Sequence, residues 1–164
     1  MMGPTEFAQL VDAHGPALQL YARQWCDVPE DIVQDAFVKL FTARPGPTDV
    51  AAWLYRVVRN AAMDAAKTSR RRKKREAAAA RPEPWFAQDQ AGGLDAKQAI
   101  VALQALPIDE REAIVAHLWG GLSFEQIGAV ADCSASTAFR RFSKGIEQLR
   151  KTLEAPCPTQ PSNS

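Results

Sequence analysis

The segment GGLSFEQIGAVADCSASTAFRRFSKGIEQLRKTL (residues 120–153) constrains folding most, because it carries signals for two helices separated by a tight turn. Gly120 and Gly121 end any preceding helix. Ser123 and Gln126 have the spacing of a capping box, which starts a new one. Asp132 can adopt the left-handed turn that would end it. A short helix, a three-residue turn and a longer helix form the helix-turn-helix motif.

The spacing of small and apolar residues supports this motif. Gly128 lies where the two helices must approach closely. The first helix turns Ile127, Val130 and Ala131 inward, and the second buries Ala138, Phe142, Gly145 and Leu149. A helix in the major groove uses Arg to bond guanine and Ser or Thr to bond phosphates or bases. The candidate residues for duplex DNA are Ser136, Thr137, Phe139, Arg140, Arg141, Ser143 and Lys144. The alternative is a solvated basic face on an ordinary helical hairpin.

The rest of the chain also has helical periodicity. Apolar residues recur at helical spacing between Phe7 and Trp25, with Gly15-Pro16 as an expected break or kink. Pro29 opens a second helix, which the segment RPGP (44–47) ends. Thr48 is the predicted N-cap of a third helix running to about Lys67.

The third predicted helix has two different faces. Its apolar residues would be buried, whereas an aromatic, arginines and an amide share another strip. Such a strip suits bases that have left the stack, and the basic run at 67–75 could neutralise phosphates. The candidates for binding an opened strand are Trp53, Arg56, Arg59, Asn60, Lys67, Arg70 and Arg71. In the alternative, Trp53 belongs to the core and the strip is merely solvated.

The second predicted helix has a wide apolar stripe flanked by acidic residues. This pattern suits protein docking through Asp31, Gln34, Asp35 and Phe37. A central core helix would have the same pattern, and both interpretations can hold together.

The sequence therefore predicts an all-α protein of two small helical domains joined by a flexible linker. The domains would span residues 1–76 and 94–154, and the second would contain the helix-turn-helix. Residues 77–93 mix Ala, Pro, Gly and charge without a period, and residues 155–164 would be a disordered tail.

Several classes of protein are unsupported. The three cysteines are not in CxxC pairs, and neither His14 nor His117 has a metal-like spacing, so we expect no metal, cofactor or disulfide framework. No constellation of nucleophile and base appears, so we expect no enzyme. Without a signal peptide or an apolar span of about 18 residues, we expect a cytoplasmic protein that does not enter the membrane. A net charge of +1 does not by itself indicate a nucleic-acid binder.

Three segments together resemble the extracytoplasmic-function sigma factors of bacterial RNA polymerase. Residues 30–41 are similar to the family's polymerase-binding helix, residues 51–72 to the helix that follows it, and residues 102–153 to its second domain. The matching positions are Asp31, Gln34 and Phe37; Trp53, Leu54, Arg59, Asn60 and Asp64; and Leu106, Pro107, Arg111, Leu122, Ser123, Glu125, Ile127, Thr137 and Arg141.

The resemblance implies a mechanism without chemistry. The second helix would dock on the beta-prime clamp helices of core RNA polymerase, and the third would help to open the −10 element of promoter DNA. The helix-turn-helix would read the −35 element while packing on the beta flap. A cognate anti-sigma factor is usual in the family.

The sequence departs from the family at several positions. Phe139 replaces a residue that is mostly polar or basic, and could touch a thymine methyl or pack inward. Ile146 replaces a usual charge, which suggests extra packing, and Asp132 replaces a common Gly. A stand-alone helix-turn-helix regulator that binds duplex DNA as a dimer is the alternative function, although it leaves the strip at 53–67 and the adjoining basic run unexplained.

Overall fold

The structure, a computed structural model, describes residues 2–76 and 94–154, which form seven α-helices and no β-strand within those ranges. The all-α prediction is confirmed. The predicted linker (77–93) and tail (155–164) lie outside the described residues. The helices are α1 (Pro4–Ala22), α2 (Pro29–Thr42), α3 (Val50–Glu76), α4 (Leu94–Gln104), α5 (Ile108–Leu118), α6 (Phe124–Ala131) and α7 (Ala135–Glu154).

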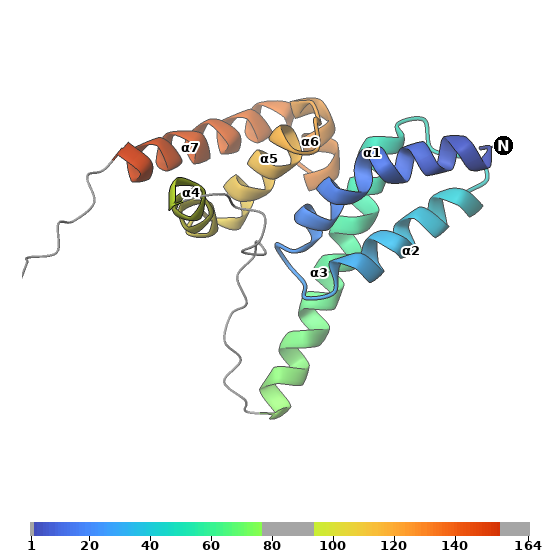
Figure 1. Ribbon diagram of the computed structural model, residues 1–164, viewed down its shortest axis with the longest axis horizontal. Helices are drawn as coiled ribbons and strands as arrows, with labels where there is room; N and C mark the ends of the chain where they lie inside the picture. The colour runs from blue at the N-terminus through green and yellow to red at the C-terminus, as the bar shows by residue number, and fades with distance from the viewer. Residues whose placement is uncertain (1, 77–93, 155–164) are drawn as a thin grey trace, which may run out of the picture.

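The first three helices pack against one another around a shared apolar core (Figure 1). Pro29 occupies the first turn of α2, followed by the predicted acids Glu30 and Asp31. The apolar stripe of α2 faces α1 and α3, and its buried members are Ile32, Val33, Ala36, Phe37 and Leu40. The core-helix interpretation of this stripe therefore holds.

Of the break or kink predicted at Gly15-Pro16, the break does not occur, because α1 continues through Pro16. A proline inside a helix removes one hydrogen bond and crowds the carbonyl of the residue four positions earlier. Here that residue is Asp12, which is exposed, so water can reach its backbone. Packing by Leu18 and Tyr21 in the next turn, both fully buried, stabilises the continuous helix.

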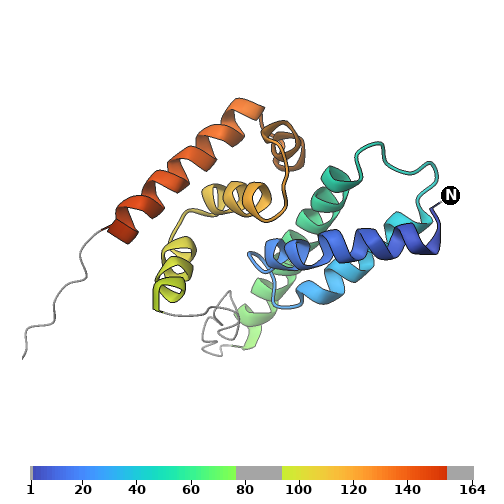
Figure 2. The same cartoon turned by 45° about the horizontal axis from the view of Figure 1, so that its top comes forward.

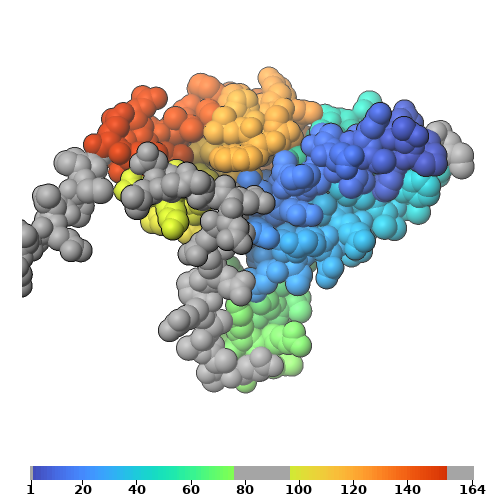
Figure 3. All heavy atoms as spheres, viewed as in Figure 1, coloured from blue at the N-terminus to red at the C-terminus, as the bar shows by residue number. Residues whose placement is uncertain are grey.

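The third helix differs from its prediction at both ends. Asp49 rather than Thr48 caps it, with the Ala52 amide donating to Asp49 Oδ1 at 3.0 Å. The helix also runs to Glu76 rather than to Lys67, so the basic run is helical. Lys and Arg are good helix formers, and a helix already seeded by packing extends at little cost. The basic end of α3 projects from the rest of the molecule (Figures 1 and 3).

The last four helices form the helix-turn-helix and its support. The capping box is confirmed, because the Gln126 amide donates to Ser123 Oγ at 3.1 Å and the Ser123 amide to Gln126 Oε1 at 2.8 Å. Asp132 has a φ of 54°, as expected for the turn. A Cβ on Gly128 would lie 2.6 Å from the Cys133 carbonyl oxygen, so this close approach requires glycine. Ile146 packs against the core.

The two groups of helices pack side by side (Figures 1 and 2). Helix α5 contacts α1, and α6 contacts the first half of α3. Gly120, two residues after the end of α5, lies against the ring of the fully buried Tyr55, where a Cβ would meet the tyrosine hydroxyl. The arrangement therefore brings the first half of α3 into an interface.

Candidate nucleic-acid interface

Helix α7 presents a polar strip to solvent on its N-terminal half. Ser134 caps the helix, with the Thr137 amide donating to Ser134 Oγ at 3.1 Å. Thr137 is half-buried, whereas Ser136, Phe139, Arg140 and Ser143 are exposed. Arg140 forms no hydrogen bond or ion pair with the described residues. The strip has the composition and placement of a helix that reads duplex DNA.

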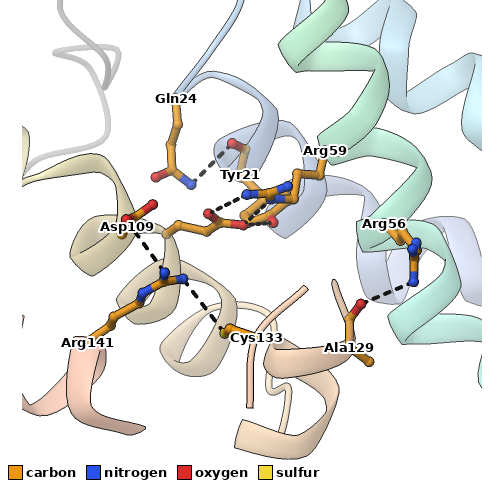
Figure 4. A network of polar contacts seen from close by, with 9 residues as sticks. Tyr21, Gln24, Arg56, Arg59, Asp109, Ala129, Cys133 and Arg141 are labelled. Carbon is orange, nitrogen blue, oxygen red and sulfur yellow. Dashed lines mark hydrogen bonds and ion pairs between the residues drawn. The ribbon is translucent and has the colours of Figure 1, made fainter. Parts of the chain in front are cut away.

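Two other basic residues of α7 are held by acids on α5. Arg141 Nη2 lies 3.7 Å from Asp109 Oδ2, and Arg141 Nη1 lies 3.7 Å from Cys133 Sγ (Figure 4). Lys144 Nζ lies 3.5 Å from Glu110 Oε1. These pairs orient both cations beside the strip. If α7 lies in the major groove of a duplex, both cations face the phosphate backbone at the edge of that groove.

The predicted strip on α3 has a different environment, because the second group of helices covers part of it. Arg59 Nε donates to Glu112 Oε1 at 2.6 Å, and Arg59 Nη2 donates to Oε2 at 3.4 Å. Tyr21 Oη donates to the same Glu112 Oε1 at 2.6 Å. The Glu112 side chain is 3% exposed and that of Arg59 is 15% exposed, so this ion pair is largely buried. Figure 4 shows Tyr21 and Arg59 turned toward each other at this interface.

The pKa values of both donors to Glu112 are raised at this interface. Burial, together with the charge of Glu112, raises the pKa of Tyr21 well above its ordinary value, so the hydroxyl remains a donor. Burial alone would lower the pKa of Arg59, but the hydrogen bond and charge of Glu112 more than offset it, and the pKa is raised. The guanidinium also lies 5.9 Å from the centre of the Trp25 ring. Tyr21, Arg59 and Glu112 therefore form a charged, hydrogen-bonded link between the first three helices and the last four.

Two more contacts join α3 and α6 at the surface. Arg56 donates to the Ala129 carbonyl oxygen at 3.2 Å (Figure 4) and to Asp132 Oδ1 at 3.3 Å. Gln126 Nε2 donates to Asp49 Oδ2 at 2.9 Å. The hydrogen bonds from the Ala52 amide and from Gln126 lower the pKa of the Asp49 carboxyl. These contacts are more exposed than the Arg59 pair.

The other predicted α3 residues remain accessible. Trp53 is half-buried and packs against the core, so it combines the two alternatives for this residue. Asn60, Lys67, Arg70 and Arg71 are exposed. The predicted strand-binding residues therefore fall into two sets. Arg56 and Arg59 are bonded to α6 and α5, whereas the exposed residues from Asn60 to Arg71 follow α3 toward its projecting end.

The predicted docking residues on α2 also divide. Asp31, Gln34 and Asp35 are exposed, but Phe37 is only 4% exposed and meets Phe7 edge-on within the core. The exposed strip continues instead through Val38 and Phe41, which are 57% and 45% exposed and were not among the predicted docking residues. A groove of about 500 Å³ lies beside this strip, between α1 and α2.

Glu112 and Tyr21 were also missed as interface residues. The signal that could have found Glu112 is its place directly before the apolar run Ala113 to Ala116, because an acid that is buried beside such a run is almost always paired. Within the described ranges there is no cluster of three or more His, Cys, Asp or Glu side chains able to hold a metal. No described helix is long and apolar enough to span a bilayer.

Comparisons with known families match both groups of helices. The sigma-70 region 2 family matches residues 10–73, and the sigma-70 region 4 family matches residues 96–149. The RNA polymerase sigma factor CarQ of Myxococcus xanthus is 32% identical over 158 residues, covering 90% of this chain and 88% of CarQ. The ECF RNA polymerase sigma-E factor of Escherichia coli is 29% identical, covering 78% and 74% of the two chains.

Solved structures agree with these matches. The sigma factor RpoE of Bartonella quintana, solved with the anti-sigma factor NepR, superposes with a TM-score of 0.75 at 26% identity, covering 93% of this chain and 99% of that one. CnrH, solved with the cytosolic domain of CnrY, shares the fold with a TM-score of 0.62 at 24% identity. The chain belongs to the sigma-70 family and is an extracytoplasmic-function sigma factor of RNA polymerase.

Proposed function

We propose that this sigma factor divides its work between a first domain (1–76), which docks on core polymerase and holds the opened −10 strand, and a second domain (94–154), which reads the −35 duplex. The observation that carries the proposal is the polar strip of α7. Ser136, Arg140 and Ser143 are exposed along the second helix of a helix-turn-helix and have no role in packing. Thr137, Arg141 and Lys144 border the strip, and we assign Arg141 to phosphate.

For the opened strand we assign two sets of α3 residues. Asn60, Lys67, Arg70 and Arg71 are accessible and would meet the strand first, with cations neutralising phosphate. Trp53, Arg56 and Arg59 complete the site. Because Arg59 is held by Glu112 and Arg56 by Asp132, the two domains must separate before these arginines can reach DNA.

For polymerase docking we assign the exposed strip of α2. Asp31, Gln34 and Asp35 supply polar contacts to the beta-prime clamp helices, and Val38 supplies an apolar one. Phe37 supports the strip from within the core. The second domain would pack on the beta flap.

We further propose that the chain acts in the cytoplasm, without catalysis of its own and without a cofactor. An anti-sigma factor is a fitting partner, because the fold superposes along 93% of its length on a sigma factor solved with its anti-sigma factor. Such a partner would be expected to favour the closed arrangement of the domains.

The experiment that tests the docking assignment is co-purification with bacterial core RNA polymerase. Wild-type chain should bind core, and a Gln34→Ala, Val38→Ala double variant should bind at least tenfold more weakly. Gln9→Ala, which changes an exposed glutamine on α1, is the matched control and should bind like wild type. Equal binding by the double variant and wild type would refute the assignment of α2.

A further inference from the structure

Phe139 is an exposed aromatic residue in an otherwise polar strip. It is the fifth residue of α7, one turn beyond the Ser134 cap, and is 55% exposed. Its neighbours on the same side, Ser136, Arg140 and Ser143, are exposed and hydrophilic. The structure therefore excludes the alternative in which Phe139 packs inward.

The ring of Phe139 is held in place from behind. It meets Phe124 edge-on, with centroids 5.2 Å apart and planes at 86°. Phe124 in turn stacks on His117 at 4.5 Å, and His117 Nδ1 lies 2.8 Å from the Leu122 carbonyl oxygen. Phe142 completes the cluster, 5.4 Å from Phe124. One edge of Phe139 is thus fixed by packing while the rest of the ring faces outward.

The surroundings of Phe139 indicate what covers it. A protein-docking patch would place further apolar side chains around the ring, but its exposed neighbours on α7 are serines and an arginine. Those neighbours suit the edges of base pairs and the phosphate backbone. Among the groups that base pairs present in the major groove, the thymine 5-methyl is the apolar one.

We propose that Phe139 reads the 5-methyl group of one thymine in the upstream promoter duplex. The inference rests on the proposed function of α7 and adds to it a specificity-determining residue with a defined base preference. A phenylalanine offers no hydrogen-bond donor or acceptor, so it distinguishes thymine through apolar contact alone. Its fixed position lowers the entropy lost when the contact forms.

The test uses deoxyuridine, which pairs like thymine and lacks only the methyl group. Holoenzyme made from core polymerase and full-length chain first selects bound duplexes from a randomised pool. Each thymine of the selected upstream element is then replaced in turn by deoxyuridine, and binding is measured. Burial of one methyl-sized group predicts about a fourfold loss of affinity at a single position for wild type.

The variants decide whether Phe139 is responsible. Phe139→Ala should show no loss at that position, and Phe139→Leu should keep part of it, with circular dichroism and the melting temperature close to those of wild type. If Phe139→Ala discriminates thymine from deoxyuridine as wild type does, or if no replacement affects wild type, the inference is overturned. If Phe139→Ala weakens core binding and leaves thymine discrimination intact, the ring docks on polymerase instead. If holoenzyme forms but selects no upstream element, the proposed reading role of α7 fails, and the inference fails with it.

Discussion

Replacing Glu112 by glutamine should open the two domains. Glu112 belongs to α5 but makes its hydrogen bonds across the interface, to Arg59 of α3 and Tyr21 of α1. With the domains apart, its carboxylate would face water and contribute little to either fold. The substitution Glu112→Gln therefore changes the closed state and leaves the open state nearly unaltered.

The magnitude follows from burial. The two side chains of the ion pair are 3% and 15% exposed, and breaking a buried pair from one side costs about 3–5 kcal/mol. Glutamine keeps the volume of the side chain and can still accept one hydrogen bond, so the lower end of the range applies. A loss of about 3 kcal/mol lowers the ratio of closed to open molecules on the order of 100-fold.

The assay is energy transfer between dyes on the two domains. Cysteines introduced at the exposed Lys39 and Gln148, in a background without the native cysteines, report the distance between α2 and α7. Transfer should be efficient in the wild type and reduced in Glu112→Gln. The variant should also bind opened promoter strand more tightly, because Arg59 is released.

The matched control is Asp132→Asn. Asp132 also bonds an α3 arginine across the interface, at 3.3 Å, but the two side chains are 73% and 54% exposed. Exposed pairs contribute about 0–1 kcal/mol, and asparagine tolerates the left-handed backbone at this position. Wild-type energy transfer in Glu112→Gln, or a larger effect from Asp132→Asn, would refute the buried pair as the main link between the domains.

Three further predictions concern individual residues of the two domains. Tyr21→Phe removes a hydrogen bond to a carboxylate and should destabilise the closed state by about 1.5–3 kcal/mol in urea titrations. Tyr55→Phe removes a buried hydroxyl that has no partner among the described residues, so it should be neutral or stabilising. Equal losses of stability in the two variants would contradict this prediction. Gly128→Ala places a Cβ 2.6 Å from a backbone oxygen and should lower the free energy of unfolding by about 1–3 kcal/mol, so an unchanged melting temperature would count against the close approach. Neutralising Arg70 and Arg71 should weaken DNA binding equally on all sequences and reduce the salt slope by about 1.4–1.8, whereas a loss confined to some sequences would point to base contacts.

Local chemistry made much of the fold predictable. The Ser123–Gln126 capping box, the first-turn proline at Pro29 and the left-handed turn at Asp132 each depend on a few adjacent residues, and the structure contains all of them. Gly128 could be predicted as a close approach because the motif itself specifies where two helices meet. These features need no information from distant parts of the chain.

The differences arise where distant residues decide. Pro16 stays inside α1 because packing further along the helix outweighs one lost hydrogen bond, and the helix through Arg70 is seeded by packing near Leu54. The partnership of Arg59 with Glu112 joins residues 53 positions apart, and no periodicity predicts it. An apolar stripe does not reveal which of its members will be covered, so the buried Phe37 could not be told from Phe41, which lies one turn further along the stripe and is 45% exposed.

The assigned roles of α3 and α7 are tested most directly by transcription with bacterial core RNA polymerase on fragmented genomic DNA, with and without this chain, followed by mapping of the transcript starts. We expect new starts that appear only with the chain and share two upstream elements, one near −10 and one near −35. Arg140→Ala should relax the preference within the −35 element alone, while Asn60→Ala should reduce opening at the −10 element. If the chain produces no new starts although it binds core polymerase, or if the new starts share no upstream elements, the assigned roles of α3 and α7 are contradicted.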